Sequence, residues 1–172
     1  GHALGESAAA IARGDADVMI AGGAESTVSP LAIGAFAQMR ALSTRNDAPE
    51  KASRPYDAQR DGFVLSEGAV VFVLEELEHA TRRGARIYAE LRGYGASADA
   101  YHLSSLAEGA EGSQRSMRRA LATAGLAATD IDFVSAHATS TPGGDGEEAV
   151  AIATVFAANK ANLHVSATKS MV

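Results

Sequence analysis

Apolar residues along this chain follow two periods, and each period predicts a different kind of element. Apolar positions at helical spacing predict helices over residues 2–13, 30–42, 75–83, 113–124 and 145–158. Short apolar runs and strict alternation predict strands over residues 17–23, 69–75, 87–95, 131–136 and 163–167. Strands that alternate with helices are typical of a layered α/β fold.

Two of these strands also carry an expectation about pairing or ends. Only a short charged helix separates the strands at 69–75 and 87–95. A parallel pair needs a crossover of a dozen or more residues, so we expect these two to be antiparallel neighbours. We expect the first strand to end in a turn at Gly22 and Gly23, where glycine also permits two backbones to approach closely.

The polar residues gather at the ends of the last two strands. His137 follows the strand at 131–136, and Lys169 follows the strand at 163–167. One helix separates these strands, so a crossover would place them side by side and in parallel. Ligands of α/β proteins bind at the carboxyl ends of such strands. We therefore expect His137 and Lys169 to share one cleft with Glu148, which lies on the helix between them.

These three side chains suggest a charge-stabilising site. A histidine near neutrality can donate a hydrogen bond to a developing oxyanion. A pair between Lys169 and Glu148 would fix the ammonium group. The residues alone supply no nucleophile, so a purely structural histidine stays open as an alternative. They also suggest no metal site.

Residues 43–69 form a long irregular segment that is rich in arginine and carboxylates. Loops of this length are usually functional or interfacial. For the individual charges, we favour the interpretation that arginine–carboxylate pairs hold the loop together.

Composition narrows the possible functions. The chain has 172 residues, of which 47% are hydrophobic, and a formal net charge of -6. That charge argues against general nucleic-acid binding, which needs a basic face. No apolar run approaches the roughly 20 residues of a membrane span. The chain has no cysteine, starts almost at once in helix-like sequence and stops just after a strand. We therefore expect an internal fragment of a longer protein.

Several motifs in order along the chain carry a resemblance to a known family. They are the segments 14–19 (GDADVM), 21–25 (AGGAE), 40–43 (RALS), 54–57 (RPYD), 60–64 (RDGFV), 74–76 (LEE), 99–102 (DAYH), 136–142 (AHATSTP) and 168–171 (TKSM). With them the chain resembles the elongating β-ketoacyl-acyl carrier protein synthases, most closely the type II branch. The resemblance implies an α/β, thiolase-like layered αβαβα fold, present in part. Residues 1–92 would end the N-terminal half, and residues 93–172 would begin the C-terminal half.

The resemblance also implies a reaction, a decarboxylative Claisen condensation in fatty acid elongation. The family uses a Cys-His-His set whose cysteine would precede Gly1 and whose second histidine would follow Val172. His137 would polarise the malonyl thioester and stabilise its enolate. Lys169 would supply charge and hold the histidines, with Glu148 as its supporting partner.

Further roles follow from the same resemblance. Thr139 and Thr141 match positions that hydrogen-bond the phosphopantetheine arm, and Ser104 and Ser105 match its outer wall. Phe36 matches a residue that lines the acyl pocket. Arg40 matches a docking point for the acidic carrier protein. The resemblance implies a cytoplasmic homodimer that binds acyl carrier protein but no nucleic acid or membrane, and no cofactor beyond the carrier's phosphopantetheine.

Three departures and two alternatives remain. Ala138 replaces a usual glycine, Ser66 replaces another before Glu67, and Tyr56 replaces a usual tryptophan or phenylalanine. The added methyl group of Ala138 would strain a backbone that favours glycine. The alternatives are a non-catalytic subunit of the chain-length-factor type and a ketosynthase domain of a polyketide synthase. The residue a few places upstream of Gly1 would separate the first alternative from an enzyme, since a cysteine there supports the enzyme and another residue supports the non-catalytic subunit.

Overall fold

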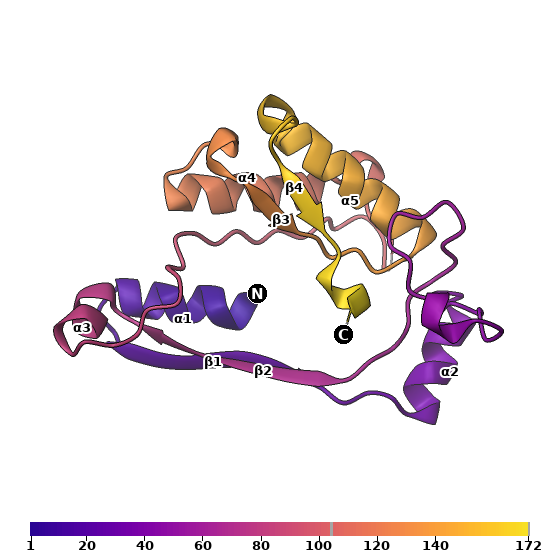
Figure 1. The fold of residues 1–172 in the computed structure, drawn as a ribbon, viewed down its shortest axis with the longest axis horizontal. Coiled ribbons are helices and arrows are strands. Elements are labelled where there is room, and N and C mark those ends of the chain that lie inside the picture. The colour runs from indigo at the N-terminus through magenta and orange to yellow at the C-terminus, as the bar shows by residue number, and fades with distance from the viewer. Residues whose placement is uncertain (104, 172) are drawn as a thin grey trace.

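The computed structural model describes residues 1–103 and 105–171, and its elements form two groups (Figure 1). The first group contains α1 (His2–Ala12), β1 (Val18–Glu25), α2 (Pro30–Gln38), β2 (Gly68–Glu75) and α3 (Leu77–Arg82). The second contains α4 (Glu111–Ala124), β3 (Phe133–Ser135), α5 (Pro142–Val155) and β4 (His164–Ser166). Short 3₁₀ turns lie at Pro49–Lys51, Glu108–Ala110, Ala128–Asp130, Ala157–Asn159 and Thr168–Met171. Helices and strands alternate in the second group as predicted.

In the first group, β1 and β2 form an antiparallel ribbon that α1 contacts on one side. The register pairs Val18 with Glu75 and Glu25 with Gly68. The strand does not turn at its glycines, so the predicted end at residue 23 is wrong. A Cβ atom on Gly22 would collide with the carbonyl oxygen of Val70 in β2. Glycine therefore permits the close approach of two backbones, but it does so inside the ribbon.

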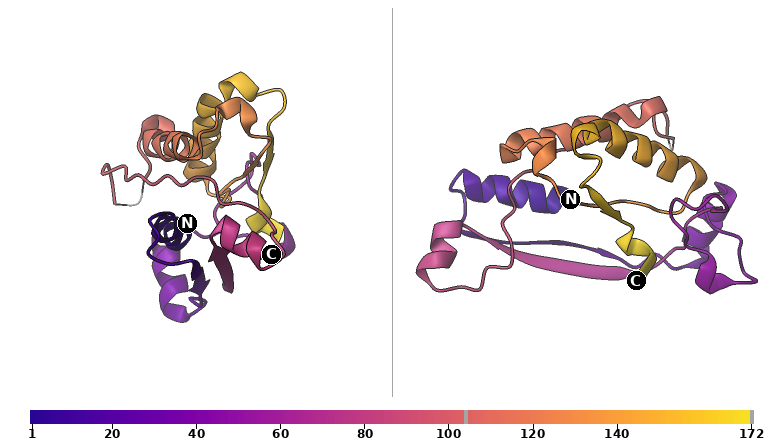
Figure 2. Two further views of the ribbon diagram at one scale, coloured as in Figure 1. Left: turned by 90° about the vertical axis from the view of Figure 1, so that its left-hand side faces the viewer. Right: turned by 45° about the horizontal axis from the view of Figure 1, so that its top comes forward.

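In the second group, β3 and β4 are parallel neighbours, which confirms that prediction. The register pairs Phe133 with His164 and Ser135 with Ser166. Helices α4 and α5 pack against each other beside these strands (Figure 2). Their buried core consists of Ala136, Ala138, Ile152 and Phe156. The core thus begins directly at the end of β3, and it anchors the turn that follows.

The predicted strand over residues 87–95 is wrong, and so is its pairing with 69–75. Segment 85–100 has no strand pairing, and β2 pairs with β1 instead. Tyr94 bonds through its backbone to the hydroxyl of Thr123 on α4. Arg119 of α4 donates to the carbonyl of Ala96 at 2.7 Å. Alternation predicts an extended chain, but a strand also needs a partner, and in the described part of the chain helix side chains take those backbone groups.

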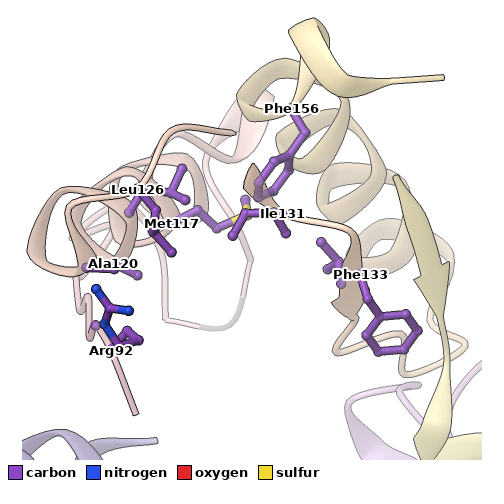
Figure 3. A pocket seen from close by; sticks show the side chains of 11 residues that line it. Arg92, Met117, Ala120, Leu126, Ile131, Phe133 and Phe156 are labelled. Atoms are coloured by element: carbon purple, nitrogen blue, oxygen red, sulfur yellow. The ribbon is translucent and has the colours of Figure 1, made fainter. Parts of the chain in front are cut away.

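An apolar hollow of about 340 Å³ opens between α4 and the β3 region (Figure 3). Met117 and Leu126 line it from one side, and Ile131, Phe133 and Phe156 line it from the other. Phe133 is 55% exposed. The hollow thus exposes one apolar side of the second group, on elements that also position the turn after β3.

Candidate active site

The carboxyl ends of β3 and β4 meet, as the sequence predicts. The hydroxyls of Ser135 and Thr168 lie 3.2 Å apart. Beyond them, the ammonium group of Lys169 donates to the backbone carbonyl of His137 at 3.0 Å. The parallel register of the two strands brings these residues together although they are 32 positions apart.

Glu148 reaches the same turn from α5, but its partner differs from the predicted one. Its carboxylate accepts hydrogen bonds from the backbone N–H of His137 at 2.6 Å and of Ala138 at 2.8 Å. No ion pair joins Lys169 and Glu148, both of which lie in the described part of the chain. The prediction of that pair is wrong because two backbone donors take up the carboxylate, and the ammonium group takes a carbonyl.

Tyr56 adds a third hydrogen bond to the Glu148 carboxylate. Its hydroxyl donates to Oε2 of Glu148 at 3.0 Å. Burial raises the pKa of the Tyr56 hydroxyl, and the charge of the Glu148 carboxylate raises it further. The hydroxyl therefore remains a donor at neutral pH. In the sequence, Tyr56 stands out only as a replacement for the tryptophan or phenylalanine that is usual in the resembling family.

The turn after β3 contains strained backbone. Ala138 has a φ of 41° and Ser140 a φ of 69°, a region that side chains other than glycine rarely occupy. Both residues are buried, Ala138 at 2% exposure and Ser140 at 0%. This confirms the expected strain at Ala138. Such conformations persist only where the surrounding contacts fix them.

Asp145 supplies several of those contacts. Its side chain is 1% exposed, and it accepts from the backbone N–H of Ser140 at 3.0 Å and of Tyr56 at 2.8 Å. The guanidinium group of Arg60 lies 3.6 Å away. The sequence predicts a helix that starts at Asp145 and gives this residue no other role. The helix in fact begins at Pro142, which places Asp145 inside the first turn with its carboxylate toward the strained backbone.

The segment between α2 and β2 forms several hydrogen bonds to the turn. Arg54 donates its backbone N–H to the hydroxyl of Ser140 at 3.0 Å, and Gly62 donates to the Ser140 carbonyl at 3.1 Å. Arg60 donates to the carbonyls of Thr141 at 3.1 Å and Pro142 at 2.6 Å. Arginine–carboxylate pairs hold this loop, as the sequence predicts: Arg54 pairs with Asp57 inside the loop, and Arg60 pairs with Asp145 on α5.

The His137 side chain experiences opposing charges. Burial lowers its pKa, and the nearby Lys169 ammonium lowers it further, whereas the carboxylates of Glu148 and Asp145 act in the opposite direction. The net shift is downward, so the imidazole is neutral at pH 7. A neutral imidazole carries one N–H that can donate to an oxyanion.

The other predicted residues occupy three places. Thr139 and Thr141 lie in the turn, with their hydroxyls 3.2 Å apart. Phe36 packs edge-on against Phe63 at 5.2 Å, one residue from Gly62, and so lies behind the loop that holds the turn. Arg40 is exposed just beyond the end of α2.

Ser105 lies in a different region from the turn. It borders a polar hollow of about 430 Å³ that also contains Asp99 and His102. Ser104, which we predicted beside it, lies outside the described residues. Within residues 1–103 and 105–171, no cluster of histidine and acidic side chains has metal-binding geometry, and no helix is long and apolar enough to cross a bilayer.

Comparison with known families identifies the class of protein. Residues 1–80 match the family described as beta-ketoacyl synthase, N-terminal domain, and residues 88–172 match beta-ketoacyl synthase, C-terminal domain. The chain therefore belongs to the β-ketoacyl synthase family. Its fold agrees with that of a ketosynthase solved with its type II polyketide acyl-carrier protein, at a TM-score of 0.95 and 38% identity over 99% of this chain and 42% of that one. The predicted partial thiolase-like fold is thus confirmed.

Relatives with curated names are more specific. The chain is 55% identical over 170 residues to a 3-oxoacyl-[acyl-carrier-protein] synthase 2 of Coxiella burnetii, with 99% of this chain and 41% of that protein covered. It is 53% identical to the mitochondrial 3-oxoacyl-[acyl-carrier-protein] synthase of Arabidopsis thaliana, over 98% of this chain and 37% of that protein. The chain thus spans about 41% of the length of a relative of this kind.

Proposed function

We propose that the whole protein is a 3-oxoacyl-[acyl carrier protein] synthase of fatty acid elongation. In the malonyl thioester, the bond to the carboxylate breaks, carbon dioxide leaves and the electron pair forms an enolate. The enolate carbon then attacks an enzyme-bound acyl thioester, a carbon–carbon bond forms and the enzyme thiolate leaves. The observation that carries this proposal is the neutral His137 at the end of β3, with its backbone bonded to both Lys169 and Glu148.

Three side chains in or beside the turn have roles in this reaction. His137 donates to the enolate oxygen, where negative charge develops, and so lowers the barrier to decarboxylation. Burial and, to a smaller extent, the Lys169 ammonium keep the His137 imidazole neutral, and Lys169 also holds the backbone carbonyl of His137. Glu148 fixes the backbone of the turn. The nucleophilic cysteine and the second histidine belong to parts of the protein outside these 172 residues.

The substrate contacts extend the proposal. Thr139 and Thr141 bind the phosphopantetheine arm of the carrier, which is the only prosthetic group that the reaction needs. Ser104 and Ser105 border that arm, and Phe36 lines the acyl pocket. Arg40 contacts the acidic acyl carrier protein, and the solved ketosynthase in complex with its carrier supports such a partner.

The organisation of the protein is part of the same proposal. Residues 1–92 end one thiolase-like half and residues 93–172 begin the other, which the separate family matches over 1–80 and 88–172 support. We infer a homodimer in the cytoplasm. Relatives include mitochondrial enzymes, so fractionation of cells of the source organism tests the location.

The decisive experiment uses the full-length protein. We expect it to release carbon dioxide from malonyl-carrier and to form 3-oxoacyl-carrier, and we expect His137→Ala to abolish both by removing the oxyanion donor. His164→Ala is the matched control, because His164 lies exposed on the neighbouring β4. Carbon dioxide release that His137→Ala leaves unchanged would contradict the assigned role.

The alternatives have weaker support. Curated relatives at 48–55% identity are named as 3-oxoacyl-[acyl-carrier-protein] synthases. The solved polyketide ketosynthase and the ishigamide ketosynthase/chain length factor are each 38% identical. A subunit of the chain-length-factor type would form no acyl-enzyme. Mass spectrometry of the full-length protein after exposure to acyl-carrier separates that case from an enzyme.

A further inference from the structure

Three residues other than glycine with positive φ converge on two carboxylates of α5. They are Tyr56 with a φ of 62°, Ala138 with 41° and Ser140 with 69°. Asp145 and Glu148 lie one helical turn apart and accept hydrogen bonds from the backbone N–H groups of all three residues. Glu148 also accepts one from the Tyr56 hydroxyl. Strain of this kind persists only where surrounding contacts fix it.

Tyr56 bridges the two carboxylates. Its backbone N–H donates to Asp145 at 2.8 Å, and its hydroxyl donates to Glu148 at 3.0 Å. Oε2 of Glu148 also accepts the N–H of Ala138, while Oε1 accepts the N–H of His137. The hydroxyl therefore orients the carboxylate that holds both amides of the strained turn. A phenylalanine here would keep the ring and lose only this bond.

We propose that Tyr56 is a positioning residue for His137, acting through Glu148 to hold the turn at Ala138 in its strained conformation. This inference rests on the proposed function, because it assigns Tyr56 an effect on the decarboxylation step. Tyr56 itself does not contact the reacting atoms. By holding the turn, its hydroxyl sets the direction in which the imidazole N–H of His137 points toward the enolate oxygen.

The test compares Tyr56→Phe with Tyr88→Phe in the full-length protein. Tyr88 is 83% exposed, and its ring packs under Arg86, far from the turn in sequence. A hydrogen bond to a charged group is lost only in Tyr56→Phe, so we expect its kcat for malonyl decarboxylation to fall about tenfold, with KM within about twofold of wild type. Equal kcat values in the two variants would overturn the proposal.

Ala138→Gly tests the link to backbone strain. Glycine adopts a φ of 41° without a steric penalty, so the turn should depend less on the Tyr56 hydroxyl. Adding Tyr56→Phe to Ala138→Gly should lower kcat by less than about threefold, against about tenfold in the wild-type background. A tenfold loss in both backgrounds would also overturn the proposal, because Tyr56 would then not act through the turn.

Hydrogen exchange gives a measure that does not depend on activity. Amides in the peptide that covers residues 136–141 should exchange faster in Tyr56→Phe than in Tyr88→Phe. If the wild-type protein releases no carbon dioxide, the proposed function fails, and this measurement still decides whether Tyr56 holds the turn. Equal exchange in both variants would contradict the positioning role.

Discussion

The turn after β3 and the β1–β2 ribbon handle polar and apolar residues in opposite ways. The turn buries polar groups, with Ser140 at 0% and Asp145 at 1% exposure, and the chain itself supplies their hydrogen-bond partners. The ribbon exposes apolar groups, with Ile20 at 74% and Val71 at 66%. Proteins usually bury apolar side chains and expose polar ones, so buried polar groups and large exposed apolar patches both depart from that distribution.

The difference separates what this part of the protein completes from what it does not. A buried polar turn needs no further partner once its donors and acceptors are hydrogen-bonded, and residues 54–62 supply many of those bonds. A ribbon with apolar residues on both faces removes them from water only when another protein surface covers it. Because relatives are more than twice as long as this chain, we infer that the remainder of the protein covers the ribbon.

The largest expected effect comes from breaking the turn. Asp145→Asn replaces a buried carboxylate that two backbone amides and Arg60 contact. We expect the full-length protein to lose about 4 kcal/mol of unfolding free energy, because the strained backbone loses one of two carboxylate acceptors and the part-buried Arg60 guanidinium loses its charged neighbour. Urea unfolding measures this, with Asp47→Asn as the exposed control. A loss equal to that of the control would mean that the turn holds itself.

A second substitution tests the ribbon. Val71 is 66% exposed here, and an exposed position would tolerate Val71→Asp at a cost below about 0.5 kcal/mol. If the remainder of the protein covers the ribbon, the same change buries an unpaired charge and should cost about 3 kcal/mol in the full-length protein. Urea unfolding again gives the value, and Val70→Asp tests the opposite face. A negligible cost at both sites would remove the contrast between the two regions.

The end of the ribbon carries a charged cluster that acid should weaken. Glu75 accepts hydrogen bonds from Arg83 and from His79, which hold its pKa at about 2, below the ordinary value of 4.5. A lowered carboxyl pKa gives stability that is present above pH 4.5 and is lost as the pH falls toward about 2.

Glu75→Gln should therefore be less stable than wild type at pH 6, and the difference should vanish toward pH 2. Glu78→Gln on α3, three residues further along the chain, is the control, because the Glu78 side chain is 84% exposed. Chemical unfolding at a series of pH values measures both. A difference between Glu75→Gln and wild type that stays constant with pH would show that the cluster does not titrate in this way.

The sequence predicts the position of His137 and Lys169 correctly because two short-range rules suffice. Period and length define β3 and β4, and a single intervening helix makes them parallel neighbours. The side chain that each strand end carries then follows from the order of residues. The same reasoning fails for 87–95, because alternation does not reveal whether a partner strand is present.

The contacts that hold the turn could not be predicted in the same way. Tyr56 and Glu148 are 92 positions apart, and Arg54 and Ser140 are 86 apart, with no periodic pattern that connects them. The predicted ion pair between Lys169 and Glu148 does not form, because the backbone N–H groups of His137 and Ala138 compete for the carboxylate and opposite charge alone does not reveal them. Ala138, by contrast, signalled its strain, since it stands where the resemblance predicts glycine.

The smallest expected effect concerns the charge balance inside the turn. Burial and the Lys169 ammonium both lower the pKa of His137, so Lys169→Met should raise that pKa, and burial should keep it from rising further. Because the pKa of His137 is lowered, its neutral imidazole and the stability linked to it are fully present above the ordinary value of 6.5, and both are lost as the pH falls through the lowered pKa of the folded protein. The acid limb of malonyl decarboxylation should therefore move to higher pH in Lys169→Met.

NMR titration of His137 in the full-length protein measures the shift directly, with Lys160→Met on the exposed turn before β4 as the control. An unchanged His137 pKa in Lys169→Met would mean that the ammonium acts on the turn only through its hydrogen bond to the His137 carbonyl, and not through its charge.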